Sequence, residues 1–193
     1  MTLSGPVSLS GDDSTLLEDE RAILDRARAL IPRLTERAPV AAAARRLPQE
    51  TIAEYREAGI LRSLQPRRFG GLQGRFSLFS RIVEEVTFGC ACSAWVYAVL
   101  AEHQWIIAQY PEQAQIDVWG ENPEAVASSS LAPRAAAKPV PGGWRLSGRY
   151  TFSSGCDFAQ WVIIGAFLGQ AGDPRSVAYL LVPVSEVEIV DDW

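Results

Sequence analysis

The residue pattern of this chain changes near residue 124, and this change restricts the possible folds more than any other feature. Before that position apolar residues recur at helical spacing, whereas after it apolar runs are short, rich in β-branched residues and interrupted by Gly and Pro. Helices and strands are therefore expected in two successive blocks rather than in alternation. This order predicts an α+β fold, with a flexible N-terminus at residues 1–13, a helical domain at residues 14–124 and a β domain at residues 125–193.

The first block contains a series of predicted amphipathic helices. The first of them begins near a capping residue, Asp13 or Ser14, and its apolar stripe extends to Leu34. Pro48 suits the first turn of the second helix, and Gly59 suits its end. The later helices are predicted at residues 76–87, 92–110 and 112–119.

The second block contains short predicted strands joined by turns. A tight turn at Pro141, Gly142 and Gly143 predicts a hairpin between the residues on either side of it. No helix or polar tail follows the last strand, so we expect further chain or a partner chain to cover one face or edge of the sheet. The strands are predicted at residues 125–131, 135–140, 143–152, 160–168, 177–183 and 188–190.

Composition excludes several classes of function. The 193-residue chain has 23 acidic and 18 basic side chains and a net charge of −5, so it lacks the basic surface of a nucleic-acid-binding protein. The longest apolar run, residues 91–101, is too short to span a membrane, and residues 1–13 do not resemble a signal peptide. Three cysteines are too few, and odd in number, for a disulfide framework. These features predict a soluble cytoplasmic protein with neither a nucleic acid nor a membrane as partner.

The common catalytic motifs are absent or weak. Cys90 and Cys92 are two residues apart, His103 is the only histidine and Cys156 is remote, so small buried thiols explain the cysteines better than a zinc site does. The serines lack the G-x-S-x-G context of a nucleophile, and the glycine-rich motifs that bind phosphate do not occur. Neither metal chemistry nor a serine triad is therefore predicted.

Two clusters of serine on adjacent predicted strands are candidates for a binding site. Hydroxyl and backbone N–H groups at a strand edge suit a flat heterocycle rich in hydrogen-bond acceptors, such as the isoalloxazine ring of a flavin, against which Phe152 can pack. The residues alone favour a simpler alternative, in which one cluster is a strand with a solvated face and the other is a turn. The clusters are Ser128, Ser129 and Ser130, followed by Ser153 and Ser154.

Trp95, Val99 and His103 are spaced so that they share one face of the fourth predicted helix. An aromatic ring and an imidazole on such a face can line a pocket for an aromatic substrate. An ordinary core stripe with a hydrogen-bonded histidine is the more common explanation of this pattern.

A series of short motifs occurs in a fixed order along the chain. Together they resemble the reduced-flavin-dependent monooxygenases built on the acyl-CoA dehydrogenase fold, especially the 3-hydroxy-9,10-seco-steroid monooxygenase type and related phenol hydroxylases. The resemblance extends from about residue 16 to the end of the chain. The motifs are Leu47-Pro48-Gln49-Glu50-Thr51, Leu64-Gln65-Pro66, Phe69-Gly70-Gly71-Leu72-Gln73, Ser93-Ala94-Trp95-Val96, His103-Gln104-Trp105, Val118-Trp119-Gly120, Ser128-Ser129-Ser130, Ala132-Pro133, Gly142-Gly143, Ser153-Ser154-Gly155-Cys156-Asp157 and Trp161.

The resemblance implies a helical N-terminal domain, a middle antiparallel β-barrel domain and a C-terminal helical bundle, of which this chain carries the first and part of the second. It implies that the complete protein is a homotetramer and the oxygenase component of a two-component system. Such proteins receive reduced FMN or FAD from a separate flavin reductase and form a C4a-hydroperoxyflavin with O₂. They then hydroxylate a small aromatic substrate, which is a phenol.

The resemblance also implies roles for individual residues. Trp95 matches a position in the aromatic substrate pocket and His103 matches a neighbouring position. The family's general base is a histidine of the C-terminal bundle, so no catalytic base is expected in this chain. Phe152 stands where close relatives have Trp, and Phe158 replaces a polar residue, which leaves ring stacking and substrate identity open. The residues that match flavin-contacting positions are Ser128, Ser129, Ser130, Phe152, Ser153 and Ser154.

Two other functions remain open at this point. One is an acyl-CoA dehydrogenase-type flavoprotein oxidoreductase, although Ser153-Ser154-Gly155 stands where that branch has Ile-Thr-Asn. The other is an inactive half-length subunit with a binding or structural role.

Overall fold

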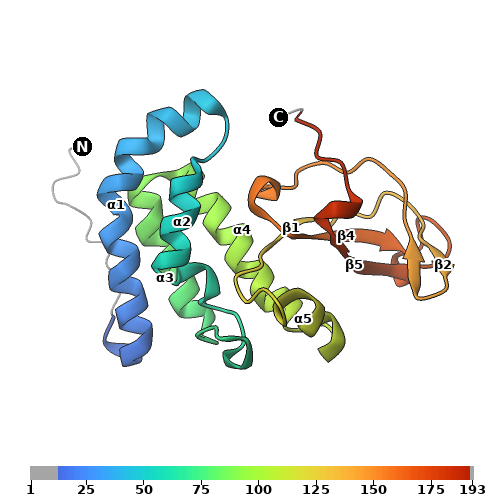
Figure 1. Cartoon of the computed structure of the whole chain (residues 1–193), viewed down its shortest axis with the longest axis horizontal. Helices are drawn as coiled ribbons and strands as arrows, with labels where there is room; N and C mark the ends of the chain where they lie inside the picture. The colour runs from blue at the N-terminus through green and yellow to red at the C-terminus, as the bar shows by residue number, and fades with distance from the viewer. Residues whose placement is uncertain (1–12, 192–193) are drawn as a thin grey trace, which may run out of the picture.

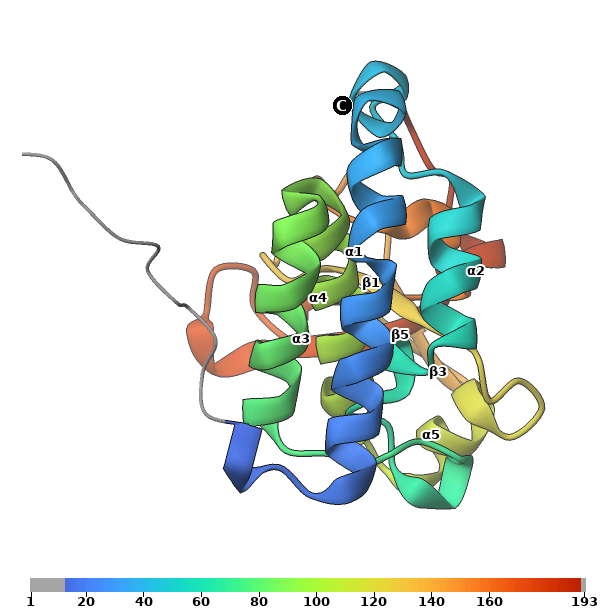
Figure 2. The ribbon, with the colours of Figure 1, turned by 90° about the vertical axis from the view of Figure 1, so that its left-hand side faces the viewer.

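A computed structural model describes residues 13–191 and shows a group of helices followed by a small sheet (Figure 1). The helices α1 to α4 pack side by side, and α5 lies next to the start of the sheet (Figures 1 and 2). Within residues 13–191 no helix is both long enough and apolar enough to cross a membrane. The predicted flexible segment, except Asp13, lies outside the described residues. The helices are α1 (Glu18–Ala44), α2 (Gln49–Glu57), α3 (Phe76–Gly89), α4 (Ala91–Ile107) and α5 (Glu112–Trp119).

Most of the helix predictions are confirmed within a few residues, but the predicted start of the first helix is wrong. Asp13 begins a separate 3₁₀ turn, and α1 starts after Leu17. The helix starts there because the Glu20 carboxylate caps it. Glu20 accepts the Leu17 N–H at 3.1 Å and is buried against Arg75. The hydrogen bonds from Arg75 lower the pKa of Glu20 to about 2, so this N-terminal cap stays charged.

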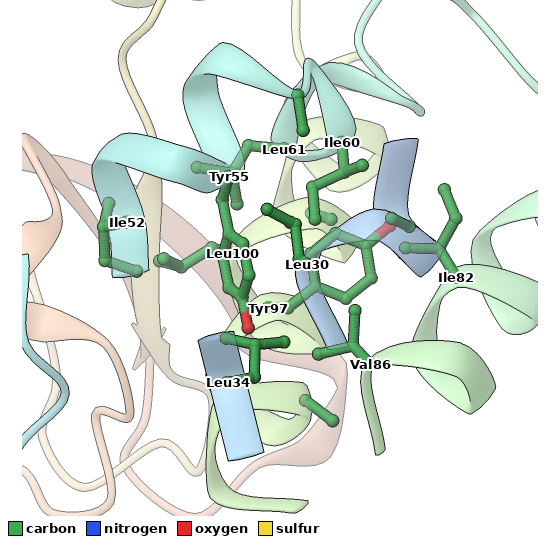
Figure 3. Close-up of a cluster of buried hydrophobic side chains, with 14 of the residues drawn as sticks. Leu30, Leu34, Ile52, Tyr55, Ile60, Leu61, Ile82, Val86, Tyr97 and Leu100 are labelled. Atoms are coloured by element: carbon green, nitrogen blue, oxygen red, sulfur yellow. The ribbon is translucent and has the colours of Figure 1, made fainter. Parts of the chain in front are cut away.

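The core of the helical part lies between α1, α2, α3 and α4 (Figure 3). Ile52 and Tyr55 of α2 are fully buried. The rings of Tyr55 and Tyr97 meet edge to face with their centroids 5.9 Å apart. Aromatic and aliphatic side chains from all four helices thus give α4 a rigid inner face.

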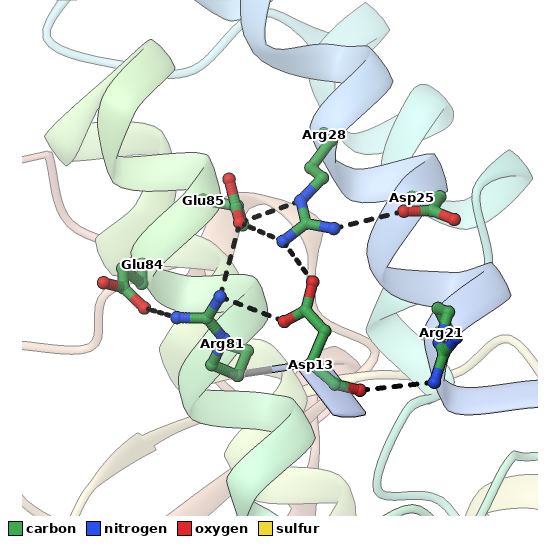
Figure 4. A network of polar contacts seen from close by, with 7 residues as sticks. All are labelled: Asp13, Arg21, Asp25, Arg28, Arg81, Glu84 and Glu85. Carbon is green, nitrogen blue, oxygen red and sulfur yellow. Dashed lines mark hydrogen bonds and ion pairs between the residues drawn. The ribbon is translucent and has the colours of Figure 1, made fainter. Parts of the chain in front are cut away.

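Charged residues tie the first turn to two helices (Figure 4). Arg28 of α1 contacts Asp13 at 2.7 Å and Glu85 of α3 at 2.8 Å. Arg81 of α3 reaches the other carboxylate oxygen of Asp13 at 3.1 Å. These partners hold the pKa of Asp13 below its usual value, mainly through the hydrogen bond from Arg28.

The main sheet has the order β1-β4-β5, with β1 (Ala127–Ser130), β4 (Trp161–Phe167) and β5 (Val177–Pro183). The expected antiparallel pairing holds for β4 with β5, whereas β1 runs parallel to β4. Parallel neighbours need a long crossover, and residues 131–160 supply it. That crossover contains a separate antiparallel hairpin of β2 (Lys138–Val140) and β3 (Gly143–Arg145).

Several predicted strands are shorter than expected. The strand predicted at 143–152 pairs only as far as Arg145, and residues 188–190 form no strand. Residues 146–155 are mostly exposed or half-buried loop, because no neighbouring strand lies beside them to accept their hydrogen bonds. In contrast, the predicted bounds of β5 and α5 are confirmed at both ends.

A second, smaller core joins the sheet to the helices. Ala127 of β1 and Ile163 of β4 pack with Ile107, Val118 and Trp119. The C-terminal end of α4 therefore supports the back of β1. This contact determines which side chains of β1 can face a ligand.

Candidate functional site

Strand β1 places two of its three serines on one face. Ser128 Oγ accepts a hydrogen bond from Ser153 Oγ at 3.0 Å, and Ser130 Oγ donates to the Thr151 carbonyl oxygen at 2.8 Å. Side chains alternate along a strand, so Ser129 points to the opposite face. The structure therefore brings Ser128 and Ser130 together with the loop that carries the second serine cluster, and it separates Ser129 from them.

The second cluster lies on a loop, not on the strand that the sequence predicts. Phe152 has a positive φ of 60°, which is uncommon and strained for a residue with a side chain, and its ring is 76% exposed. Gly155 has a φ of 77°, and a Cβ there would lie 3.0 Å from the Leu100 side chain of α4. This backbone path seats the loop directly against α4 and directs Ser153 toward β1.

Trp95 connects α4 to this loop. Its indole N–H donates to Ser154 Oγ at 3.0 Å, while the side chain as a whole is 63% exposed. An indole N–H can only donate, so Ser154 acts as acceptor in this bond and keeps its own hydroxyl proton for another partner. Helix, loop and strand thus bring Trp95, Ser154, Ser153 and Ser128 together. We call this group, with Ser130, the hydroxyl cradle, and Ser128 and Ser130 form its buried floor.

His103 lies behind β1, buried to 3% exposure. Its Nδ1 is 2.7 Å from the Ala127 carbonyl oxygen, which can only accept, so Nδ1 carries the proton. Burial lowers the pKa of His103, which favours the neutral ring and leaves Nε2 as an acceptor. The imidazole therefore fixes the strand immediately before Ser128.

Gln104 and Trp119 hold the same strand, although the residue pattern alone did not single them out. Gln104 Nε2 donates to the Ala125 carbonyl oxygen at 3.2 Å, and Trp119 Nε1 donates to Gln104 Oε1 at 3.0 Å. The sequence did contain one signal for Gln104: it is a polar residue next to His103 in a mostly apolar helix. Such a residue needs partners when it is buried.

Two other features do not belong to the cradle. A hollow of about 560 Å³ lies beside Trp105 and Arg68, but Arg68 is already bound to Glu112 and Gln115. The cysteines at 90, 92 and 156 are free, and within residues 13–191 no group of three His, Cys, Asp or Glu side chains is placed to hold a metal ion.

Comparison with known proteins assigns the chain to a family. The sequence profile of the acyl-CoA dehydrogenase N-terminal domain matches residues 17–121, which is more than half of the chain. The chain belongs to this family. The acyl-CoA dehydrogenase-like fold that the sequence motifs implied is thereby confirmed.

The names of individual relatives describe more specific functions than the family name does. The chain is 44% identical over 151 residues to the oxygenase component of an FADH₂-dependent resorcinol hydroxylase from Rhizobium sp. (strain MTP-10005), covering 78% of this chain and 37% of that protein. It is 36% identical over 175 residues to the flavin-dependent monooxygenase oxygenase subunit HsaA of Mycobacterium tuberculosis, covering 91% and 44%. The crystal structure of HsaA superposes with a TM-score of 0.86 over 90% of this chain and 48% of that one. The chain thus spans less than half the length of these relatives.

Proposed function

We propose that this chain provides the flavin- and substrate-facing surface of an oxygenase component that hydroxylates phenols with reduced FMN or FAD. The observation that carries the proposal is the hydroxyl cradle, in which Ser128, Ser153 and Ser154 meet beside Trp95. The names of the relatives, an FADH₂-dependent resorcinol hydroxylase and the monooxygenase HsaA, supply the reaction class.

The residues of the cradle suit an isoalloxazine ring. Ser154 accepts the Trp95 N–H and so keeps its own hydroxyl proton for a ring acceptor, whereas Ser130 and Ser153 already donate theirs within the protein. The exposed Phe152 ring adjoins this loop. A ring with carbonyl oxygens and nitrogens as acceptors matches this donor set better than a metal ion does. Bound reduced flavin would supply the electrons that activate O₂. We propose Ser128, Ser130, Phe152, Ser153 and Ser154 as flavin contacts, and Ser129 as a neighbour on the reverse face.

Trp95 acts on the substrate side in this proposal. The exposed face of the Trp95 indole provides a flat apolar surface for an aromatic ring. Its N–H donates to Ser154 Oγ, so the Ser154 hydroxyl proton is available to another partner. His103, buried behind β1, keeps this strand in position through the Ala127 carbonyl oxygen. The general base would come from the part of the relatives that this chain does not span.

We further propose a separate flavin reductase as partner, a homotetramer as the complete assembly and the cytoplasm as the location. A separate reductase is supported by the name of the resorcinol hydroxylase relative, which calls that protein an oxygenase component. The free cysteines suit a reducing compartment.

Flavin binding tests the proposal directly. Quenching of flavin fluorescence on titration with the chain should give saturable binding of FMN or FAD, and Ser154→Ala should weaken it about tenfold because a directed hydrogen bond is lost. Ser80→Ala is the matched control, since Ser80 is exposed on α3. Absence of any flavin binding by the folded chain would overturn the proposal.

Product analysis separates the reaction classes. With a flavin reductase, NADH and resorcinol, an oxygenase forms a product that carries one more hydroxyl group. A dehydrogenase would instead reduce an electron acceptor at the expense of an acyl-CoA. Flavin binding with neither reaction, also after addition of the missing part of a relative, would favour a binding subunit.

A further inference from the structure

The crossover between β1 and β4 has an unusual charge. From residue 125 to residue 156 the chain has no Asp or Glu, but it has Arg134, Lys138, Arg145 and Arg149. All of these side chains are exposed. A strongly positive segment within a chain of net charge −5 creates a local positive potential that attracts anions.

Three of these four cations have no carboxylate partner among the described residues. Most arginines elsewhere pair with an acid, as Arg68 does with Glu112 and Arg175 with Asp173. Among the described residues, Arg134, Lys138 and Arg145 form no ion pair with a carboxylate. Arg134 instead donates from Nη2 to the neutral Thr151 Oγ1 at 2.9 Å.

The hairpin brings two of the cations together. Lys138 and Arg145 are direct cross-strand partners in the β2–β3 register, so their side chains leave the same face of the hairpin. Like charges directly opposite one another destabilise a strand pair. An anion bound between them would remove that repulsion.

The positive segment begins at the hydroxyl cradle. Thr151, which Arg134 contacts, also accepts the Ser130 hydroxyl through its carbonyl oxygen. Further on, Ala136 bridges to Phe167, three residues beyond Ile164, which pairs with Ser130. At about 3.3 Å per residue, the segment therefore runs about 10 Å along β4 away from the cradle.

We propose that Arg134, Lys138 and Arg145 form a phosphate subsite that recognises the phosphorylated tail of a flavin whose ring occupies the cradle. The inference rests on the proposed function. The shared chemistry is the phosphate monoester of FMN or the pyrophosphate of FAD, which riboflavin lacks. Guanidinium groups bind such oxygens through paired hydrogen bonds, and Arg134 is already oriented by Thr151.

Affinities for riboflavin, FMN and FAD, measured by fluorescence quenching at low and high salt, test the subsite. The wild-type chain should bind FMN more tightly than riboflavin, and only this preference should decline with salt. Arg134→Gln should weaken FMN binding about tenfold and leave riboflavin binding within about twofold. Lys138→Gln and Arg145→Gln should act in the same direction, and Arg134→Lys should restore part of the effect.

Arg175→Gln is the matched control, because it removes the same charge from the same β domain where Asp173 already compensates it. Circular dichroism shows whether each variant remains folded. Equal affinity of the wild-type chain for FMN and riboflavin, or equal weakening of both by Arg134→Gln, would overturn the subsite and leave the flavin proposal intact. If these cations instead bind an acidic protein, the wild-type chain should bind FMN and riboflavin equally well.

Failure of every flavin, riboflavin included, to bind would overturn the proposed function. In that event, titration with inorganic pyrophosphate still decides the subsite. NMR shifts of the Arg134 side-chain N–H that saturate, and that vanish in Lys138→Gln/Arg145→Gln, would support it. The absence of such shifts would overturn it.

Discussion

Single hydrogen bonds orient the polar groups of the cradle. Trp95 donates to Ser154, Ser153 donates to Ser128, and Ser130 donates to a backbone carbonyl oxygen. The side chains are therefore held in place before any ligand binds, with the Ser128 and Ser154 hydroxyl protons not used in these bonds. Preorganisation of this kind decreases the cost of binding and of charge stabilisation.

Trp95 permits a test at this scale. Trp95→Ala should weaken binding of a phenolic substrate about tenfold, because the flat surface for the ring is lost, and should leave flavin affinity within about twofold. Isothermal titration calorimetry with oxidised flavin present gives both affinities. Trp144→Ala is a suitable control, since Trp144 is also partly exposed but lies on β3. Unchanged substrate affinity in Trp95→Ala would contradict the role assigned to Trp95.

Individual elements depend on close backbone contacts that single side chains can disturb. Gly165 of β4 lies so close to the segment after β1 that a Cβ there would be 2.1 Å from the Leu131 carbonyl oxygen. Backbone cannot yield as a flexible side chain can. The glycine thus permits the crossover to leave β1 directly beside the cradle.

Gly165→Ala should therefore destabilise the chain by about 1–3 kcal/mol, because either β1 or the start of the crossover must move. Urea denaturation measures the change in the free energy of unfolding. Gly143→Ala provides the comparison, because a Cβ there meets nothing within 4 Å. A loss no larger than that of the control would show that the strand accommodates the methyl group.

The spacing of apolar residues along the sequence correctly predicted those elements whose hydrogen bonds are local or whose faces are clearly apolar. The bounds of α5 and β5 agree with their patterns at both ends. The loop at Phe152, by contrast, alternates like a strand but has no neighbouring strand, and its positive φ depends on the packing of Gly155 against α4. The parallel direction of β1 depends on the path of a long crossover. Contacts between Trp95 and Ser154, 59 residues apart, are likewise invisible to local patterns.

At the scale of the whole molecule, the helices and the sheet are joined through buried polar contacts as well as apolar ones. His103 and Gln104 of α4 hold the carbonyl oxygens of Ala127 and Ala125. These bonds fix the distance between the two layers. Any change in the charge of His103 therefore acts on the position of β1.

The pKa of His103 is lowered in the folded chain, so the unfolded chain binds a proton more readily. The free energy of unfolding should consequently be unaffected by His103 above its ordinary pKa of about 6.5 and should decrease as the pH falls below that value. Urea denaturation at pH 7.5 and 5.5 should show a smaller decrease in His103→Gln than in the wild-type chain. Equal decreases would mean that carboxylates alone determine the acid sensitivity.

The tip of the β2–β3 hairpin projects from the rest of the molecule. Added Cβ atoms at Gly142 and Gly143 would meet nothing within 4 Å. Since the crossover is held at Ala136 and again at Thr151, the tip is free to vary in length between two anchored points. A fluorophore attached at this tip would report the arrival of an anionic ligand without blocking the side chains that receive it.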